Sequence, residues 1–317
     1  MSSTSEITPQ ASSAGQVAKP APTGRMTGRR HRWTGLFFSL PGVVLLLLFL
    51  AGPFLMAVGL SFTSERLASP LPTRFVGFDN YTTTLQSSSF RQALGNNVYF
   101  TAIVVPVQTG LALALAILVN QRLRGVKIYR AIYFSPVVVV MTVAATVWLL
   151  LYSPDRGLLN GILSVISFGT LQSDWLQSET MALPSIMIMS IWQGVGFQMI
   201  IILAGLQEIS EEVYEAAAID GASPWQRFAF ITVPQLRNTL LFVGTVTMIL
   251  SFRLFDQVWV MTRGAPLGAT NVMMLEMVNV GFEQQQIARG SAIAVIFFLI
   301  VLTLTIIQRR FLREEVD

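Results

Sequence analysis

Long apolar runs separated by short polar segments make up most of this chain. A helix rises about 1.5 Å per residue and the bilayer core is about 30 Å thick, so one crossing needs about 20 mostly apolar residues. Six runs approach or meet this length, at 36–61, 97–119, 131–152, 182–206, 239–261 and 287–308. The pattern predicts an all-α integral membrane protein with six transmembrane helices.

Two of the runs contain residues that disturb helices. Pro136 lies near the start of the third run, and Gly194 and Gly196 interrupt the fourth. Such breaks are tolerated in a membrane only where the freed backbone groups find partners inside a helix bundle or a wet cavity. We therefore expect these two runs to fit a straight span least well.

The chain begins and ends in polar segments. Residues 1–24 are rich in Ser, Thr, Ala, Pro and Gly without apolar periodicity, and a cluster of arginines follows. The first apolar run is longer than the core of a cleavable signal peptide, roughly 7 to 15 residues, and is interpreted as a retained span. The predicted domains are a disordered basic cytoplasmic tail over 1–35, a transmembrane domain over 36–308 and a cytoplasmic tail over 309–317.

The positions of Lys and Arg indicate how the six predicted spans are oriented in the membrane. Of these 21 residues, 14 fall in the N-terminal segment, the 120–130 loop, the 207–238 loop and the C-terminal tail, and five fall on the opposite side. Cytoplasmic loops carry the basic excess. Both termini are therefore predicted to be cytoplasmic, as an even number of crossings requires.

Composition narrows the classes of function. Charged residues make up 12% of the chain and hydrophobic residues 53%, whereas a soluble domain has roughly a quarter of its residues charged. Cysteine is absent and His31 is the single histidine, which argues against a metal site, a disulfide framework and a thiol nucleophile. The net charge of +4 follows from topology, so membrane lipid and not nucleic acid is the expected partner.

The 207–238 loop has helical signals of its own. Ser210 is a good N-cap, and Gly221 can end the first helix in a left-handed conformation. Ser223 and Pro224 then start a second helix, and Pro234 marks its end. The small side chains of the first helix, beside Glu215, predict either a docking surface for another protein or an amphipathic hairpin on the bilayer surface.

This loop resembles the EAA loop of ABC importer permeases. The family pattern E-A-A-x₃-G-x₉-I-x-L-P is matched by Glu215, Ala216, Ala217, Gly221, Ile231 and Pro234, and Val233 stands where the family usually has Leu. The chain looks closest to the maltose-type, carbohydrate-uptake permeases. That likeness is carried by residues 75–81, by Trp192 and Gly194, and by residues 255–256 and 261–266.

The resemblance implies a type I ABC importer permease fold in a bacterial or archaeal cell (inner) membrane. The implied partners are a second permease in a heterodimer, two ATPase subunits, an extracytoplasmic solute-binding protein and a sugar-like solute. The sequence has two lysines, Lys19 and Lys127, and neither lies in a P-loop. No catalytic or metal-binding residue is therefore predicted, and ATP and Mg are expected on the partner ATPases. The residues expected to couple to them are Glu215, Ala216, Ala217, Asp220 and Gly221.

Polar groups inside spans are costly and are therefore candidates for the solute path. The fourth predicted span has amide side chains beside an aromatic ring. In the fifth, Thr247, Ser251 and Leu254 share one helix face. The alternative for Thr and Ser is a role in helix packing, which is common in membrane spans. The resemblance assigns solute contacts to Gln193, Gly194, Phe197, Thr247, Leu250, Ser251 and Leu254. The maltose pattern has an Asn on the fifth-span face and this chain has none, so a different solute is expected.

Four charged residues in or near the spans leave alternatives open. Arg253 and Asp256 are three residues apart and can pair with each other, and Glu276 and Arg289 can lie at an interface instead of in the pathway. An ion-coupled secondary transporter would use Asp256 or Glu276 to carry a proton, but no inverted repeat is detected. A membrane-embedded enzyme would need a catalytic constellation, and none is visible. The solute itself, whether a sugar, a polyol or a glycerol phosphate ester, is left open.

Overall fold

A computed structural model describes residues 28–70, 72–121, 125–168 and 173–313. The regular structure of this part of the chain is helical, apart from one isolated bridge between Thr63 and Phe75. The prediction of an all-α protein is confirmed. The chain divides into two units, Met1–Pro53 and Phe54–Asp317.

The first unit contains the start of the first apolar helix. Helix α1 (Gly28–Leu46) passes through a π-helical turn (Leu47–Ala51) into α2 (Gly52–Leu60). Residues 28–35 were predicted to belong to a disordered tail and are helical instead, as the N-terminal continuation of the apolar helix. Residues 1–27 lie outside the described part.

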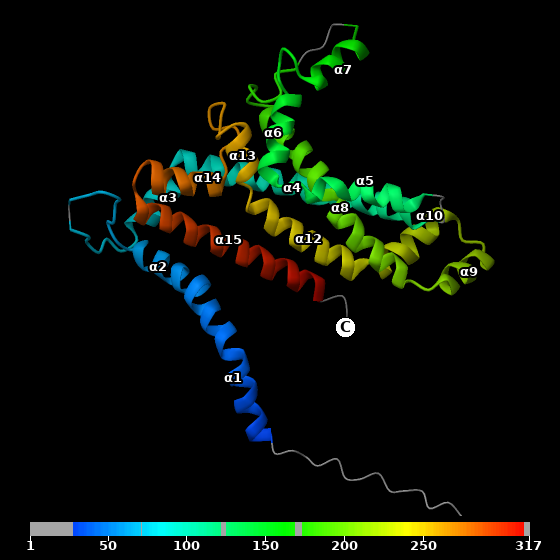
Figure 1. The fold of residues 1–317 in the computed structure, drawn as a ribbon, viewed down its shortest axis with the longest axis horizontal. Coiled ribbons are helices and arrows are strands. Elements are labelled where there is room, and N and C mark those ends of the chain that lie inside the picture. The colour runs from blue at the N-terminus through cyan, green and yellow to red at the C-terminus, as the bar shows by residue number, and fades with distance from the viewer. Residues whose placement is uncertain (1–27, 71, 122–124, 169–172, 314–317) are drawn as a thin grey trace, which may run out of the picture. The chain divides into compact units, whose positions relative to one another are not determined.

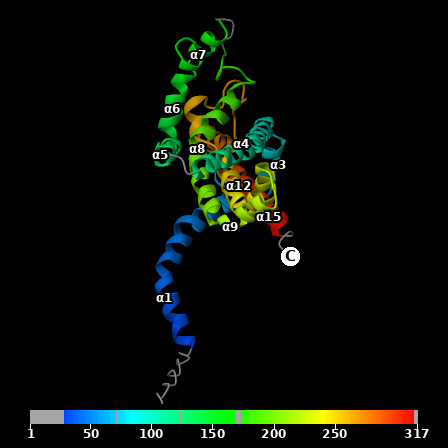
Figure 2. The ribbon, with the colours of Figure 1, turned by 90° about the vertical axis from the view of Figure 1, so that its right-hand side faces the viewer.

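The second unit is built around two long helices, α4 (Ser88–Asn120) and α8 (Ala182–Glu208), which pack extensively against each other (Figures 1 and 2). Helix α12 (Arg237–Phe252) packs on both of them, and α15 (Ile287–Arg313) packs on α12. The shorter helices are α3 (Asp79–Gln86), α5 (Val126–Val138), α6 (Met141–Leu151), α7 (Leu158–Ile166), α13 (Asp256–Met261) and α14 (Met273–Val278).

Within the described residues, four helices are long and apolar enough to cross a membrane, at Phe37–Leu60, Ser88–Asn120, Ala182–Glu208 and Ile287–Gln308. The third predicted run is divided between α5 and α6, and the two helices meet at an angle of 99°. The fifth run forms only the 16-residue helix α12 before the chain breaks and continues as α13. The count of six spans therefore stays a prediction.

The break in the third run has a half-buried side chain as its hydrogen-bond partner. Val139, between α5 and α6, adopts an extended conformation, so its carbonyl leaves the helical ladder. The Gln193 amide of α8 donates to this oxygen at 3.5 Å. Because a free carbonyl is costly in a membrane, this contact accounts for the tolerance of the break that follows Pro136.

The fourth run is continuous, so the prediction that Gly194 and Gly196 interrupt it is wrong. The glycines serve close packing instead. A Cβ atom at Gly196 would lie 2.9 Å from the carbonyl carbon of Tyr133 in α5, and one at Gly194 would lie 2.5 Å from Gln108 Nε2 in α4. Small residues let helix backbones approach each other in membranes, and here they bring three helices together.

The 207–238 loop forms the predicted hairpin, with α9 (Glu211–Ile219) and α10 (Pro224–Arg227) as its helices. The Ser210 side chain accepts from the Glu212 N–H, Gly221 has φ +79°, and Ser223 forms a capping box with Gln226. The helical stretch that begins at Pro224 ends at Gln235, one residue after the predicted end at Pro234. A π-helical turn (Phe228–Thr232) leads into α11 (Val233–Gln235), and this wider turn accommodates a proline that lacks an N–H.

Changing Gly196 to Ala tests the close contact between α8 and α5. We expect the substitution to destabilise the protein by about 1–3 kcal/mol, because the added methyl group would overlap main-chain atoms that cannot rotate away. Thermal unfolding of the purified protein in detergent measures this. Gly110→Ala in α4 is the matched control, since a Cβ there meets nothing within 4 Å; equal losses from both substitutions would contradict the packing argument.

Candidate functional site

Two neighbouring hollows lie between α4, α8 and α12. The first, here called the Phe197 hollow, has a volume of about 210 Å³, and the second, the Asp256 hollow, has a volume of about 240 Å³. Gln108, Gln193, Gly194, Thr247 and Leu250 line both of them. The two hollows therefore share one polar wall.

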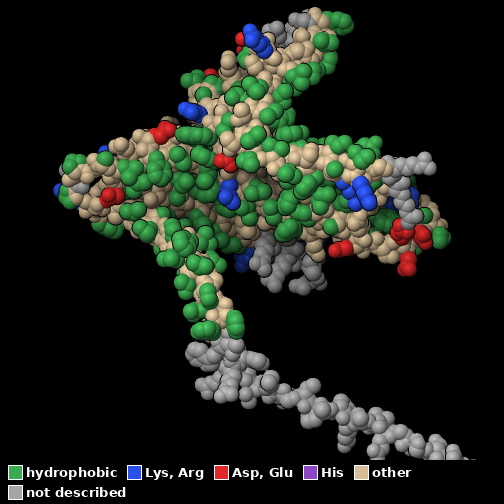
Figure 3. All heavy atoms as spheres, viewed as in Figure 1, with side chains coloured by type: hydrophobic (Ala, Val, Ile, Leu, Met, Phe, Trp, Pro, Cys, Tyr) green, Lys and Arg blue, Asp and Glu red, His purple; other side chains and the backbone are tan. Residues whose placement is uncertain are grey.

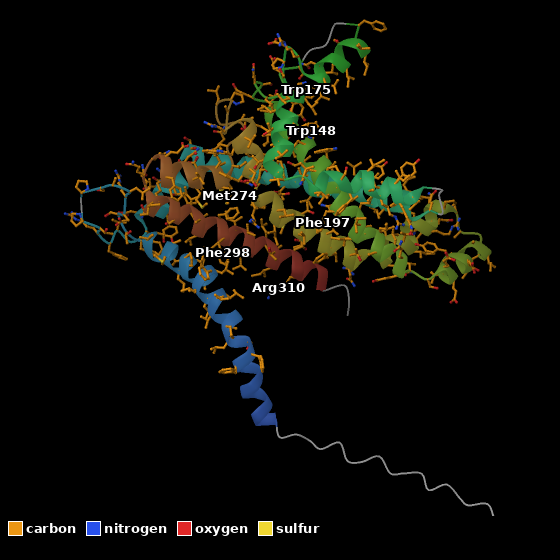
Figure 4. The ribbon with its side chains drawn as sticks, in the orientation of Figure 1. Trp148, Trp175, Phe197, Met274, Phe298 and Arg310 are labelled. Carbon is orange, nitrogen blue, oxygen red and sulfur yellow. The ribbon has the colours of Figure 1, made fainter. Side chains whose placement is uncertain are left out.

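The Phe197 hollow combines amide groups with apolar surface. Phe197 lies on α8 where this helix runs beside α12 (Figure 4), and 43% of its side chain is exposed. The Gln198 amide donates to the Thr247 hydroxyl, which donates to the Val243 carbonyl at 2.8 Å. The other amide atom of Gln198, Oε1, is buried without a hydrogen-bond partner. This hollow therefore presents acceptor capacity beside an aromatic face.

The Asp256 hollow carries the charges. Gln257 Nε2 donates to Ser190 Oγ at 3.2 Å, which links α13 to α8. Arg253 and Asp256 are both exposed and both line the hollow, and no ion pair joins these two described residues. Of the alternatives left open, the pairing of these two residues with each other is not formed, because α12 ends at Phe252 and the intervening residues are not helical.

The structure brings together all seven residues predicted to contact solute. Gln193, Gly194, Thr247 and Leu250 line both hollows, Phe197 lines the first, and Ser251 and Leu254 line the second. Their role stays a prediction. Sequence reasoning missed Gln108, a buried glutamine within the second apolar run, although its polar side chain in a span was a usable signal.

Glu276 and Arg289 lie away from both hollows. Glu276 is buried and accepts hydrogen bonds from Ser89 Oγ and Asn271 Nδ2, each at 2.7 Å. Arg289 lines a separate small depression with Glu65 and Asp79. Glu276 thus joins the start of α4 to the segment before α14, which is a structural contact.

The tip of the α9–α10 hairpin is acidic and apolar at once. Five acidic side chains are exposed there, and Figure 3 shows them gathered at that end of the molecule: Glu208, Glu211, Glu212, Glu215 and Asp220. Beside them, Ile219, Trp225 and Phe230 are 87%, 72% and 77% exposed. Ala216 is exposed and Ala217 half-buried, so the predicted coupling residues form one accessible surface.

Comparison with known proteins gives one family. The family described as "Binding-protein-dependent transport system inner membrane component" matches residues 108–314. A probable ABC transporter permease of Pyrococcus horikoshii, PH1215, is 35% identical over 271 residues, which cover 86% of this chain and 92% of that protein. The trehalose/maltose transport system permease MalF of Thermococcus litoralis is 34% identical and covers 88% of this chain and 93% of its own length.

A solved structure shares the fold. A chain of a bacterial alginate ABC transporter, in complex with an alginate pentasaccharide-bound periplasmic protein, superimposes with a TM-score of 0.79 at 21% identity and covers 90% of this chain and 96% of its own. The long apolar helices agree with the membrane location of such proteins. The chain therefore belongs to the binding-protein-dependent transport system inner membrane components, the multi-pass permease subunits of ABC importers.

Proposed function

We propose that this chain and a second permease together form the translocation path for a sugar-like solute. Two ATPase subunits hold the ATP and Mg and dock on the α9–α10 hairpin of this chain and on the corresponding loop of the second permease, and an extracytoplasmic binding protein delivers the solute. The chain has six spans, places both termini and the hairpin in the cytoplasm, and contributes no ATPase site of its own.

The observation that carries this proposal is the convergence of polar groups from three helices on one wall. Gln108 of α4, Gln193 of α8 and Thr247 of α12 all line both hollows. Polar side chains at membrane depth are expensive unless they serve a path or a partner. Amide and hydroxyl groups beside the exposed ring of Phe197 suit a solute that has hydroxyls and apolar faces.

The size of the hollows favours a second subunit. Ligand pockets usually measure about 300–1,000 Å³, and each hollow here is smaller. The side chains of Phe197 and Leu250 at the rim are 43% and 54% exposed. A second permease facing this rim would cover that apolar surface and enlarge the two hollows into one enclosed path.

The hairpin connects the ATPases to this path through the chain itself. Helix α8 ends at Glu208, immediately before the hairpin, and α12 begins at Arg237, immediately after it. These two helices carry all of the predicted solute contacts except Leu254. An ATPase that grips the exposed hairpin in two different states would therefore move the two walls directly.

Replacing Gly221 by Val tests the coupling role. Gly221 has φ +79° and open space around it, so Val would strain the turn without a clash. We expect normal membrane insertion, but loss of most uptake in proteoliposomes that contain the whole importer, while the ATPases retain hydrolysis.

Gly125→Val is the matched control for that experiment. Gly125 also has a positive φ, of +83°, and a Cβ atom added to it would meet nothing within 4 Å, but it lies before α5 and outside the hairpin. If Gly125→Val abolished uptake as fully as Gly221→Val, backbone strain alone would explain the loss.

Replacing Thr247 by Val tests the solute path. The substitution keeps the side-chain shape and removes the hydroxyl that accepts from Gln198, leaving a buried donor unpaired at a cost of about 1–3 kcal/mol. We expect the uptake rate of the reconstituted importer to fall roughly tenfold or more.

The control is Thr245→Val on the same helix. Thr245 Oγ1 likewise donates to the carbonyl four residues earlier, that of Leu241, at 2.7 Å, but this residue lines neither hollow. We expect near-normal uptake from this variant. Equal losses from the two variants would assign the effect to helix packing.

A further inference from the structure

Gln108 is the least explained polar residue in the second unit. It lies in the middle of α4, its side chain is 6% exposed, and it lines both hollows. No hydrogen bond joins its amide to another described residue. A primary amide offers two donors and an acceptor, so this group faces the path with its full hydrogen-bonding capacity.

The backbone of α8 is shaped around this amide. A Cβ atom at Gly194 would lie 2.5 Å from Gln108 Nε2, 3.1 Å from its Cδ and 3.2 Å from its Oε1. Any side chain at position 194 would therefore displace the Gln108 amide. Gly194 was predicted as a solute contact, and its geometry gives it a different role, which is to make room for Gln108.

Two further amides lie on the same wall. Gln198 Oε1 is buried without a partner, and Gln193 makes only the long 3.5 Å contact to the Val139 carbonyl. Leaving buried polar groups unpaired costs free energy that a bound partner can recover. Solute hydroxyls fit this wall because each can donate to an amide oxygen and accept from an amide N–H.

The wall is also uncharged where the amides lie. The residues that line the Phe197 hollow include no Lys, Arg, Asp or Glu, and those that line the Asp256 hollow include one of each sign, Arg253 and Asp256. An anion entering the Phe197 hollow would lose its water without meeting a cation from this chain. Burying an unpaired charge is far costlier than burying a hydroxyl.

We propose that Gln108 is a specificity-determining residue of the solute path, and that with Gln193 and Gln198 it selects a neutral polyhydroxylated solute over an anionic one. This inference rests on the proposed function, because it assumes that solute passes along these hollows. Gly194 is then a positioning residue that acts through Gln108.

The test uses the complete importer reconstituted in proteoliposomes, with this chain, the second permease, the ATPases and the binding protein. Maltose and trehalose serve as neutral probes and sn-glycerol 3-phosphate as the anionic probe. The measured quantity is solute imported per ATP hydrolysed, which a path defect lowers and a folding defect does not. For Gln108→Leu we expect the amount of neutral probe imported per ATP to fall about tenfold, as for the loss of one hydrogen bond, while the rate of ATP hydrolysis stays unchanged.

Two further variants sharpen the test. Gly194→Ala is expected to lower the same ratio, and combining it with Gln108→Leu is expected to add little, because both changes remove the same contact. Gln308→Leu in α15 is the control, since Gln308, like Gln198, has an amide oxygen buried without a partner but lines neither hollow. It is expected to import as the wild type does.

The outcomes separate the two proposals. A wild-type importer that takes up none of the probes would count against the proposed function. A wild type that imports a neutral probe while Gln108→Leu keeps the full ratio would overturn the role of Gln108. Uptake of sn-glycerol 3-phosphate equal to or faster than that of both neutral probes would overturn the selectivity for neutral solutes.

Discussion

Buried and half-buried amide side chains that satisfy main-chain groups at breaks between helices are the interaction on which the rest of this fold depends. In a membrane every exposed carbonyl or N–H costs several kcal/mol unless protein supplies a partner. Asn97 of α4 is fully buried, donates to the carbonyls of Ser251 and Phe252 at the end of α12, and accepts from the Met273 N–H at the start of α14. One side chain thus fixes two helix ends against the central helix.

The same device recurs along the chain. Asn80 donates to the carbonyls of Ser61 and Thr63, Asn96 to those of Gly268 and Asn271, and Gln193 to that of Val139. Because these anchors hold irregular backbone in place, the short helix α12 can end early and leave Arg253 and Leu254 to line a hollow. This part of the wall of the Asp256 hollow is therefore a consequence of how the helix break is stabilised.

The sequence predicted the features that depend on local chemistry. The caps at Ser210 and Ser223 and the left-handed Gly221 follow from short-range rules, and the structure confirms them. Apolar length located the helices, but it could not show that α12 ends at Phe252, since the partner that stabilises this end is Asn97, about 155 positions earlier. Gly194 and Gly196 were misread for the same reason, because only the neighbouring helices show that a missing side chain makes space and does not break a helix.

The neutral character of the amide wall also fits the task of a transit site. A path must bind solute well enough to admit it and weakly enough to release it. Hydrogen bonds between neutral groups contribute about 0.5–1.5 kcal/mol each, whereas bonds to charged groups contribute about 1.5–3 kcal/mol. In the proposed path, a wall of Gln108, Gln193 and Thr247 would therefore offer several weak contacts that can be exchanged one at a time as the solute moves. A buried arginine at the same place would hold an anion more tightly, and release would then require a larger movement of α8 and α12.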